Sequence, residues 1–342
     1  MRLGRSAVVP QRQAGAAILT AMLTVVLVAT LAATALWQQW RGIEIEAAHR
    51  TRVQSAWVLT GALDWARLIL REDARKGGAD HLAEPWAVPL EQARLSTFLA
   101  ADRSDALAAD ASQEAFLSGS IIDLQSRLNV SNLLLDGKVH APSLLAFRRL
   151  FELLGLSDRE LAVLVSNLKL AQGDAAAGAP GTSASSAPAT ANELVFATNA
   201  PLWPQDLAQL AWLGLSARSL TLLQPFVTVL PVRTPVNLNT APVEVVYACI
   251  EAFELADAHR LVTARTVTHL ATLDDAAKVG GNSAALFDAA QHSVGTRFFE
   301  ILGRLQVAQD VVVERTLVQR EGLEVRPLWR RRGPQSVVAT LQ

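Results

Sequence analysis

An uncharged stretch near the N-terminus constrains this chain more than any other feature. Residues 13–40 carry no charged side chain, and the apolar run within them, residues 16–37, is 22 residues long. In a helix these residues reach about 33 Å, enough to cross the roughly 30 Å hydrocarbon core of a bilayer. Arg2, Arg5 and Arg12 precede the run. This basic end is therefore predicted to stay in the cytoplasm while the rest of the chain is exported.

Three kinds of N-terminal segment are compatible with this pattern: a cleaved secretory signal, an uncleaved anchor, and a leader of the type IV prepilin kind. Ala33-Thr34-Ala35 resembles a signal cleavage site, but the apolar run before it exceeds the usual length of about 7–15 residues. A prepilin leader is short and basic, ends in Gly, and is removed while the apolar helix is retained. Gly15 lies directly before the apolar run, so the pattern favours the prepilin leader.

The helix is predicted to continue well beyond the apolar run. Apolar residues recur at three- and four-residue spacing up to Leu70, and no proline follows Pro10 until Pro85. Gly77 and Gly78, after a basic last turn, predict where the helix ends. An apolar first half and an amphipathic second half are typical of the spine of a pilin-like subunit.

The middle of the chain is predicted to be helical. Leu154-Gly155-Leu156-Ser157 recurs as Leu213-Gly214-Leu215-Ser216, which predicts two helical hairpins. In each, the glycine would end one helix in a left-handed conformation and the serine would cap the next. A third helix pair, residues 243–253 and 257–267, lacks the glycine. Residues 175–192 have almost nothing to bury and are predicted to be a disordered loop between the first two hairpins.

Strands are predicted on both sides of this helical block. Residues 118–128 read as one strand, and alternating apolar residues after Phe299 read as three more, with turns at Gln309-Asp310 and Glu321-Gly322. Together they predict a four-stranded antiparallel sheet. Residues 85–89 are expected to form a loop, and Arg330-Arg331-Arg332 an exposed tail.

Composition narrows the functional classes. A net charge of −1 argues against a nucleic-acid partner held by bulk electrostatics, and the single cysteine, Cys249, excludes an internal disulfide. The sequence contains no recognisable catalytic motif. Asp274-Asp275 and the group Asp102, Asp105 and Asp110 offer oxygen ligands suited to calcium, although solvated loop charge is the commoner role of such residues.

One motif suggests a competing function. Residues 236–241 (VNLNTA), followed by a helix, a loop and a helix, resemble the opening of helix-hairpin-helix DNA-binding modules. Those modules bind phosphate through the backbone N–H groups of a glycine-rich loop. The corresponding loop here, Phe253-Glu254-Leu255-Ala256, has no glycine and adds a carboxylate. We therefore expect a structural scaffold without an anion site, with Asn237 and Asn239 as cap and turn residues.

With these features combined, the chain resembles the K-class minor pseudopilins of the type II secretion system. The resemblance is carried by the leader ending at Gly15 and by residues 122–129 (IDLQSRLN), 236–241, 296–300 (TRFFE) and 316–320 (TLVQR). It implies an α+β pilin-like fold, with a long N-terminal helix on an antiparallel sheet. It also implies a large all-helical inserted domain that contains helix-hairpin-helix or SAM-like elements.

The implied domain layout covers the whole chain. Residues 1–15 would be the leader and 16–40 the membrane-spanning half of the helix. The pilin-like domain would comprise residues 41–128 and 293–342, with the inserted helical domain at residues 129–292.

The resemblance also implies how the N-terminus is processed. Prepilin peptidase would cut between Gly15 and Ala16, and the new N-terminus at Ala16 would be methylated. Most pilin-like subunits carry Glu at the fifth mature position, where it neutralises the N-terminal ammonium of a neighbouring subunit; here that position is Thr20. A buried carboxylate is costly without a partner. A subunit with nothing above it has no ammonium to meet, so Thr20 fits a place at the filament tip.

The implied role is structural and non-enzymatic: to initiate or cap the pseudopilus that exports folded proteins across the outer membrane. The implied partners are the I- and J-class minor pseudopilins, the H class as a further candidate, the major pseudopilin, the inner-membrane assembly platform and prepilin peptidase. The chain would span the inner membrane of a Gram-negative bacterium once, with its large C-terminal domain in the periplasm.

Two further expectations accompany this assignment. The alternative function is a membrane-anchored helix-hairpin-helix receptor for nucleic acid in a DNA-uptake type of system. A periplasmic enzyme with an anchor has no residue constellation to support it. Some members of the family bind calcium, so a structural calcium ion is an expectation of the resemblance, with no ligands assigned.

Overall fold

The computed structural model describes residues 14–95, 115–177, 201–280, 287–307 and 310–334. Most of the leader, the expected disordered loop beyond residue 177, and the aspartates at 102, 105 and 110 lie outside these ranges. The chain divides into two compact units, residues 1–58 and residues 59–342, and each is treated separately below.

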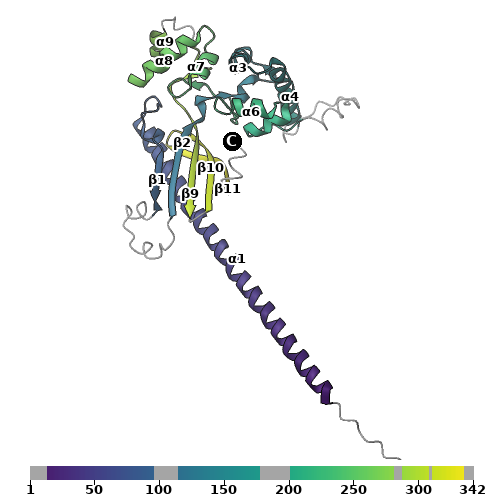
Figure 1. Cartoon of the computed structure of the whole chain (residues 1–342). Coiled ribbons are helices and arrows are strands. Elements are labelled where there is room, and N and C mark those ends of the chain that lie inside the picture. The colour runs from purple at the N-terminus through teal and green to yellow at the C-terminus, as the bar shows by residue number, and fades with distance from the viewer. Residues whose placement is uncertain (1–13, 96–114, 178–200, 281–286, 308–309, 335–342) are drawn as a thin grey trace, which may run out of the picture. The chain divides into compact units, whose positions relative to one another are not determined.

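A single long helix, α1 (Ala14–Lys76), forms the first unit and continues into the second (Figure 1). The part from Ala17 onward is long and apolar enough, by length and composition, to cross a membrane. Side chains 17–50 are all exposed. The hydroxyl of Thr20 donates to the Ala17 carbonyl at 3.0 Å, and Thr24, Thr30 and Thr34 make the same contact three residues back. These hydroxyls are thus satisfied inside the helix, as an apolar environment requires.

In the second unit, the end of α1 packs on a five-stranded antiparallel sheet in the order β1-β2-β9-β10-β11. The strands are β1 (Leu90–Arg94), β2 (Ala115–Asp123), β9 (Phe298–Val307), β10 (Asp310–Glu321) and β11 (Glu324–Pro334). The core between helix and sheet includes Leu63, Leu70, Trp86, Phe299 and Val318. The side chain of Leu70 is fully buried, which fixes this face of the helix on the sheet.

The sheet confirms the three C-terminal strands and, up to Asp123, the strand predicted at residues 118–128, which gives way to a 3₁₀ turn after Asp123. Two other expectations were wrong. The sheet has five strands where four were expected; the additional strand, β1, follows the loop expected at residues 85–89, and its sequence (LEQAR) lacks apolar alternation because the strand lies at the sheet edge. The three arginines form no tail. Arg330 and Arg332 belong to β11, and both bind Glu314 of β10, at 2.7 Å from Arg330 Nη2 and 2.6 Å from Arg332 Nε.

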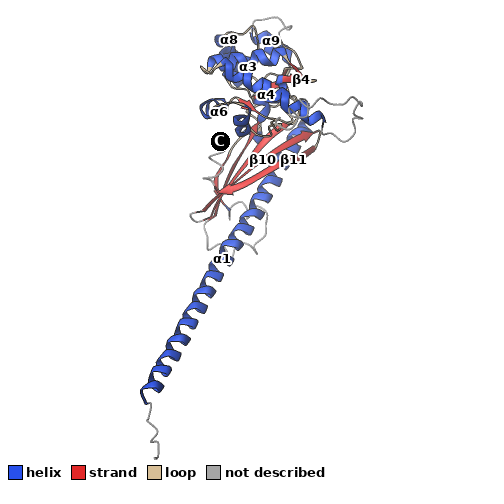
Figure 2. Ribbon diagram, turned by 90° about the vertical axis from the view of Figure 1, so that its right-hand side faces the viewer, coloured by secondary structure: helices blue, strands red, loops and turns tan. Residues whose placement is uncertain are grey.

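Strands β2 and β9 are adjacent in the sheet, with Ile121 opposite Ile301, although the whole helical block separates them in sequence. This block lies beyond one end of the sheet in both views (Figures 1 and 2). Its helices are α3 (Ala141–Leu153), α4 (Asp158–Ala177), the 3₁₀ helix η5 (Leu207–Leu213), α6 (Ala217–Leu223), α7 (Val243–Cys249), α8 (Leu255–Val267) and α9 (Leu273–Gly280). They enclose a core of their own, which includes Phe147, Leu150, Leu168 and Val246.

Short segments complete the fold. The 3₁₀ turn η1 (Pro85–Ala87) lies between α1 and β1, and the 3₁₀ turns η3 (Leu124–Ser126) and η4 (Val130–Leu133) follow β2. Three pairs of short strands are β3 (Leu128–Asn129) with β6 (Val227–Thr228), β4 (Leu134–Leu135) with β5 (Lys138–Val139), and β7 (Val236–Asn237) with β8 (His292–Ser293). The β7–β8 pair is parallel and brings residues 236–241 next to the segment that leads into β9.

The two predicted helical hairpins are present. Gly155 has φ +64° and Gly214 has φ +102°, the left-handed conformation that glycine adopts without strain. After Gly214, Ser216 caps α6 by accepting a hydrogen bond from Ser219 N at 3.2 Å. The hairpins differ in one respect: the helix before Gly214 is the 3₁₀ helix η5, where an ordinary α-helix was expected.

Candidate functional site

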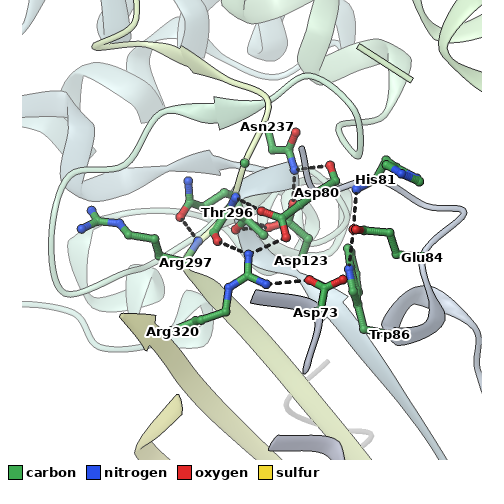
Figure 3. Close-up of polar contacts among 12 residues, drawn as sticks. Asp73, Asp80, His81, Glu84, Trp86, Asp123, Asn237, Thr296, Arg297 and Arg320 are labelled. Atoms are coloured by element: carbon green, nitrogen blue, oxygen red, sulfur yellow. Dashed lines mark hydrogen bonds and ion pairs between the residues drawn. The ribbon is translucent and has the colours of Figure 1, made fainter. Parts of the chain in front are cut away.

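Charged and polar side chains from five distant segments meet where the helical block joins the sheet (Figure 3). We call this set the polar junction. Its members are Asp73 at the end of α1, Asp80 and Glu84 in the following loop, Asp123 at the end of β2, Asn237 in β7, Thr296 before β9, and Arg320 in β10. All except Glu84 are buried.

Arg320 lies at the centre of the junction. Its Nη1 donates to Asp73 Oδ2 at 2.7 Å, and its Nη2 donates to Asp80 Oδ1 and, at 2.9 Å, to the Thr296 carbonyl. The guanidinium carbon is 4.9 Å from the centroid of the Phe299 ring, so an aromatic face supports the cation from below. One side chain of β10 thereby holds the end of α1, the loop after it and the segment before β9.

Asp123 is almost fully buried and is bound by neutral donors. It accepts hydrogen bonds from Thr240 Oγ1 at 2.6 Å, Thr296 Oγ1 at 2.7 Å, Gln125 N at 2.7 Å and Asn237 Nδ2 at 3.0 Å. Burial raises the pKa of Asp123, and these four donors oppose that rise because they favour the carboxylate. The carboxylate ties β2 to the segment after β7 and to the segment before β9.

Hydrogen bonds to Asp80 hold the loop after α1 in place. Asp80 Oδ2 accepts from Thr296 N at 2.7 Å, and the Asp80 carbonyl accepts from Asn237 Nδ2 at 3.2 Å. Burial raises the pKa of Asp80, and the neighbouring Arg320 opposes this rise. The pKa of Asp73 is also raised, first by burial and then by the negative charge of Glu84.

Among the residues that the structure describes, Asp73, Asp80 and Glu84 could hold a metal ion, since one carboxylate oxygen of each lies within 4.8 Å of the others. Their oxygens are already engaged, however. Glu84 Oε2 accepts from Trp86 Nε1 at 2.7 Å and from His81 N at 2.9 Å, while Arg320 binds the other two carboxylates. Calcium takes six to eight oxygen ligands, so it does not fit this cluster while Arg320 occupies it.

Comparison with known proteins identifies the family. Residues 126–232 and 236–296 each match a sequence profile described as "Type II secretion system (T2SS), protein K". Type II secretion system protein K of Pseudomonas aeruginosa is 28% identical over 323 residues, which cover 90% of this chain and 89% of that protein. The chain belongs to the type II secretion system protein K family.

The structural comparison agrees with this assignment. The chain superimposes on a solved structure of the GspK-GspI-GspJ complex from the enterotoxigenic Escherichia coli type 2 secretion system, with a TM-score of 0.59. The match covers 84% of this chain and 98% of that chain at 18% identity, so it shows that the fold is shared. Membership of the protein K family and the pilin-like arrangement, a long helix on an antiparallel sheet, were both predicted from the sequence and are confirmed.

The residues singled out for processing belong to the first unit, whereas the polar junction belongs to the second. Gly15 and Ala16 are in the first turn of α1, which begins at Ala14. Thr20 follows in the same helix, with the intrahelical hydrogen bond described above. Nothing in the structure tests cleavage or methylation, and both stay predictions.

Two other sequence predictions can be placed. Asn239 N donates to Asn237 Oδ1 at 3.0 Å, so Asn237 does form the expected turn. The hydrogen bonds of Asn237 to Asp80 and Asp123 were not predicted, because no local sequence pattern indicates them. Asp275 lies in the first turn of α9, where it accepts from Thr272 N at 3.1 Å and Thr272 Oγ1 accepts from Asp275 N, which is a capping box. Asp275 also pairs with Lys278 Nζ at 2.9 Å.

The helix-hairpin-helix candidate lacks a free anion site in this structure. At the start of α8, Glu254 N donates to Asp257 Oδ2 at 2.9 Å, so a carboxylate occupies the place of a phosphate. The preceding loop turns carbonyls toward Arg149, whose side chain donates to Ile250 O at 3.1 Å and Phe253 O at 2.5 Å. The guanidinium of Arg149 also lies 4.2 Å over the Tyr247 ring. The loop thus binds the chain's own cation and carboxylate.

Proposed function

We propose that this chain is a minor pseudopilin at the tip of the type II secretion pseudopilus, where it helps to initiate the filament that exports folded proteins across the outer membrane. The observation that carries the proposal is similarity along almost the whole chain: 90% of it aligns with a protein K, and its fold matches 98% of a GspK chain solved with GspI and GspJ. The corresponding I- and J-class proteins are the proposed direct partners. The H class, the major pseudopilin and the assembly platform are proposed as further partners.

The architecture supports a structural role at a filament end. The helical block emerges between β2 and β9, beyond the end of the sheet at which α1 terminates. A subunit with such a block has no second pilin-like face at that end on which to stack another subunit. We propose the domain layout given above for the same reason, with helix-hairpin-helix-like elements at α7 and α8 serving as scaffold.

The proposed location follows from α1. Its apolar part would span the inner membrane once, and the second unit would lie in the periplasm. Prepilin peptidase would cut between Gly15 and Ala16, leaving a methylated Ala16. Intact-mass measurement of the purified protein tests this directly. A mature chain beginning after Ala35 would instead identify a secretory signal.

Genetic complementation tests the proposed function. A strain lacking its own copy of this protein should lose secretion of type II substrates and regain it when the full chain is supplied. The detergent-solubilised chain should co-purify with the I- and J-class pseudopilins. Secretion that is indifferent to the deletion would contradict the proposal. Salt-sensitive binding of DNA by the purified chain would instead favour the nucleic-acid receptor.

A further inference from the structure

The charge balance of the polar junction raises a question about metal binding. Three carboxylates, those of Asp73, Asp80 and Glu84, gather within 4.8 Å of one another, and two of them are buried. Like charges at this spacing repel strongly in a partly desolvated site, so a cation must lie among them if they are to stay ionised. Proteins meet this need with a metal ion or with an arginine.

In this chain an arginine occupies that position. Arg320 reaches two of the three carboxylates with separate nitrogens, and its remaining contacts are the Thr296 carbonyl and the Phe299 ring. Its backbone is fixed as well, since Arg320 N donates to Arg297 O at 2.7 Å. A calcium ion would have to coordinate the same carboxylate oxygens while lying beside a buried guanidinium of like charge.

We propose that Arg320 is a built-in cation that takes the place of a metal ion in the polar junction, so that the helical block is held on the sheet without calcium. The residues that Arg320 joins belong to the end of α1, the loop after it, β10 and the segment before β9. Through Asp80 and Thr296 they also contact Asn237 and Asp123, which lead into the block. This inference concerns folding and stands independently of the proposed function.

The test measures thermal unfolding of the full chain in detergent, with calcium chloride or with the chelator EGTA. The wild type should unfold at the same temperature in both. Arg320→Ala should unfold at a clearly lower temperature in EGTA and regain part of the loss in calcium, because Asp73 and Asp80 then lack their cation and can bind the ion together with Glu84. The restored part should disappear in the double variant Arg320→Ala, Glu84→Gln.

Arg315→Ala is the matched control. Arg315 lies in the same strand, β10, and forms a partly buried pair with Glu300 at 2.5 Å from Nε to Oε1. This variant should also lose stability, but calcium should restore none of the loss, because Glu300 does not belong to the cluster of three carboxylates.

Two results would overturn the proposal. One is a wild-type chain whose unfolding temperature rises on addition of calcium and whose response is lost in Asp73→Asn. The other is an Arg320→Ala chain that responds to calcium no more than Arg315→Ala does. If Arg320→Ala fails to fold under either condition, Arg320→Gln decides the question: it keeps a polar but shorter and uncharged side chain, and it should show the same calcium response.

Discussion

At the scale of single residues, Asp123 is the clearest case of a side chain that no substitution should replace without cost. Four neutral donors converge on its buried carboxylate. Asp123→Ala would leave the Thr296 hydroxyl without its acceptor in a buried site, and would leave Thr240 and Asn237 with only their weaker bonds to backbone carbonyls. Because each unsatisfied buried group costs about 1–3 kcal/mol, we expect a loss of about 3–5 kcal/mol in the free energy of unfolding.

Chemical denaturation of the full chain in detergent measures this loss. Asp64→Ala is the control: Asp64 pairs with Arg67 on an exposed face of α1, and an exposed pair contributes less than about 1 kcal/mol. Asp123→Asn should lie between the two, because its amide keeps one acceptor oxygen. Equal effects of Asp123→Ala and Asp64→Ala would show that the junction contributes little to stability.

His292 predicts a pH dependence. Burial lowers its pKa from the ordinary value of 6.5. Its Nε2 lies 3.1 Å from the Cys249 carbonyl, and its Nδ1 is buried without a hydrogen-bond partner in the described part of the chain. As pH falls below about 7, the unfolded chain takes up a proton that the folded chain resists, so His292 lowers the free energy of unfolding progressively until pH passes its folded pKa.

Asp73, Asp80 and Asp123 have raised pKa values, so they increase the free energy of unfolding as pH falls, which is opposite to the effect of His292. Because these aspartates are present in both the wild type and His292→Gln, the difference between the two proteins isolates the effect of His292. The Gln amide can still donate to the Cys249 carbonyl. Denaturation between pH 8 and about pH 5 should show the wild type losing its advantage over the variant at the acid end. A stability difference that does not change with pH would contradict the assignment.

At the scale of elements, the repeated hairpins provide a natural pair of variants. Gly155 and Gly214 are both left-handed, but they differ in what surrounds them. A Cβ on Gly155 meets nothing within 4 Å, whereas a Cβ on Gly214 would lie 2.5 Å from Val163 Cγ1 of α4. Gly155→Ala should therefore cost about 1 kcal/mol from backbone strain alone. Gly214→Ala should cost about 1–3 kcal/mol more, because the Val163 side chain, or α4 with it, must move.

Equilibrium unfolding of the two variants side by side checks this difference. Double substitution of Gly214→Ala with Val163→Ala should recover part of the loss, since the smaller side chain makes room for the new methyl group. An equal loss in the free energy of unfolding at the two glycines would mean that Gly214 does not lie as close to Val163 as it does in the structure.

The elements that the sequence predicted well are those with local signals. The end of α1 at Lys76 follows from the glycine pair after it, and the left-handed glycines and serine cap follow from the repeated Leu-Gly-Leu-Ser. Strand β1 and the arginines of β11 were missed because an edge strand need not alternate apolar and polar residues. A pattern in a single sequence does not show which strand an edge strand pairs with.

The polar junction could not be predicted for a different reason. Arg320 and Asp73 are 247 positions apart, and Asp123 and Thr240 are 117 apart. No periodicity connects residues at such separations; only the order of strands in the sheet brings them together. The sequence did mark Asn237 as a turn residue, which is its local role, but its bond to Asp123 is a property of the folded chain.

At the scale of the whole molecule, Thr20 tests the proposed place at the filament tip. An unpaired carboxylate in the bilayer costs about 2.5–3.5 kcal/mol, unless the ammonium of a neighbouring subunit pairs with it. A tip subunit has no such neighbour above it, so Thr20→Glu should reduce the amount of chain that co-purifies with the I- and J-class pseudopilins, and secretion with it, by severalfold or more. Thr20→Val, which removes the hydroxyl that donates to the Ala17 carbonyl but introduces no charge, should leave both unchanged. Increased assembly of Thr20→Glu would place another subunit above this one and would contradict the tip position.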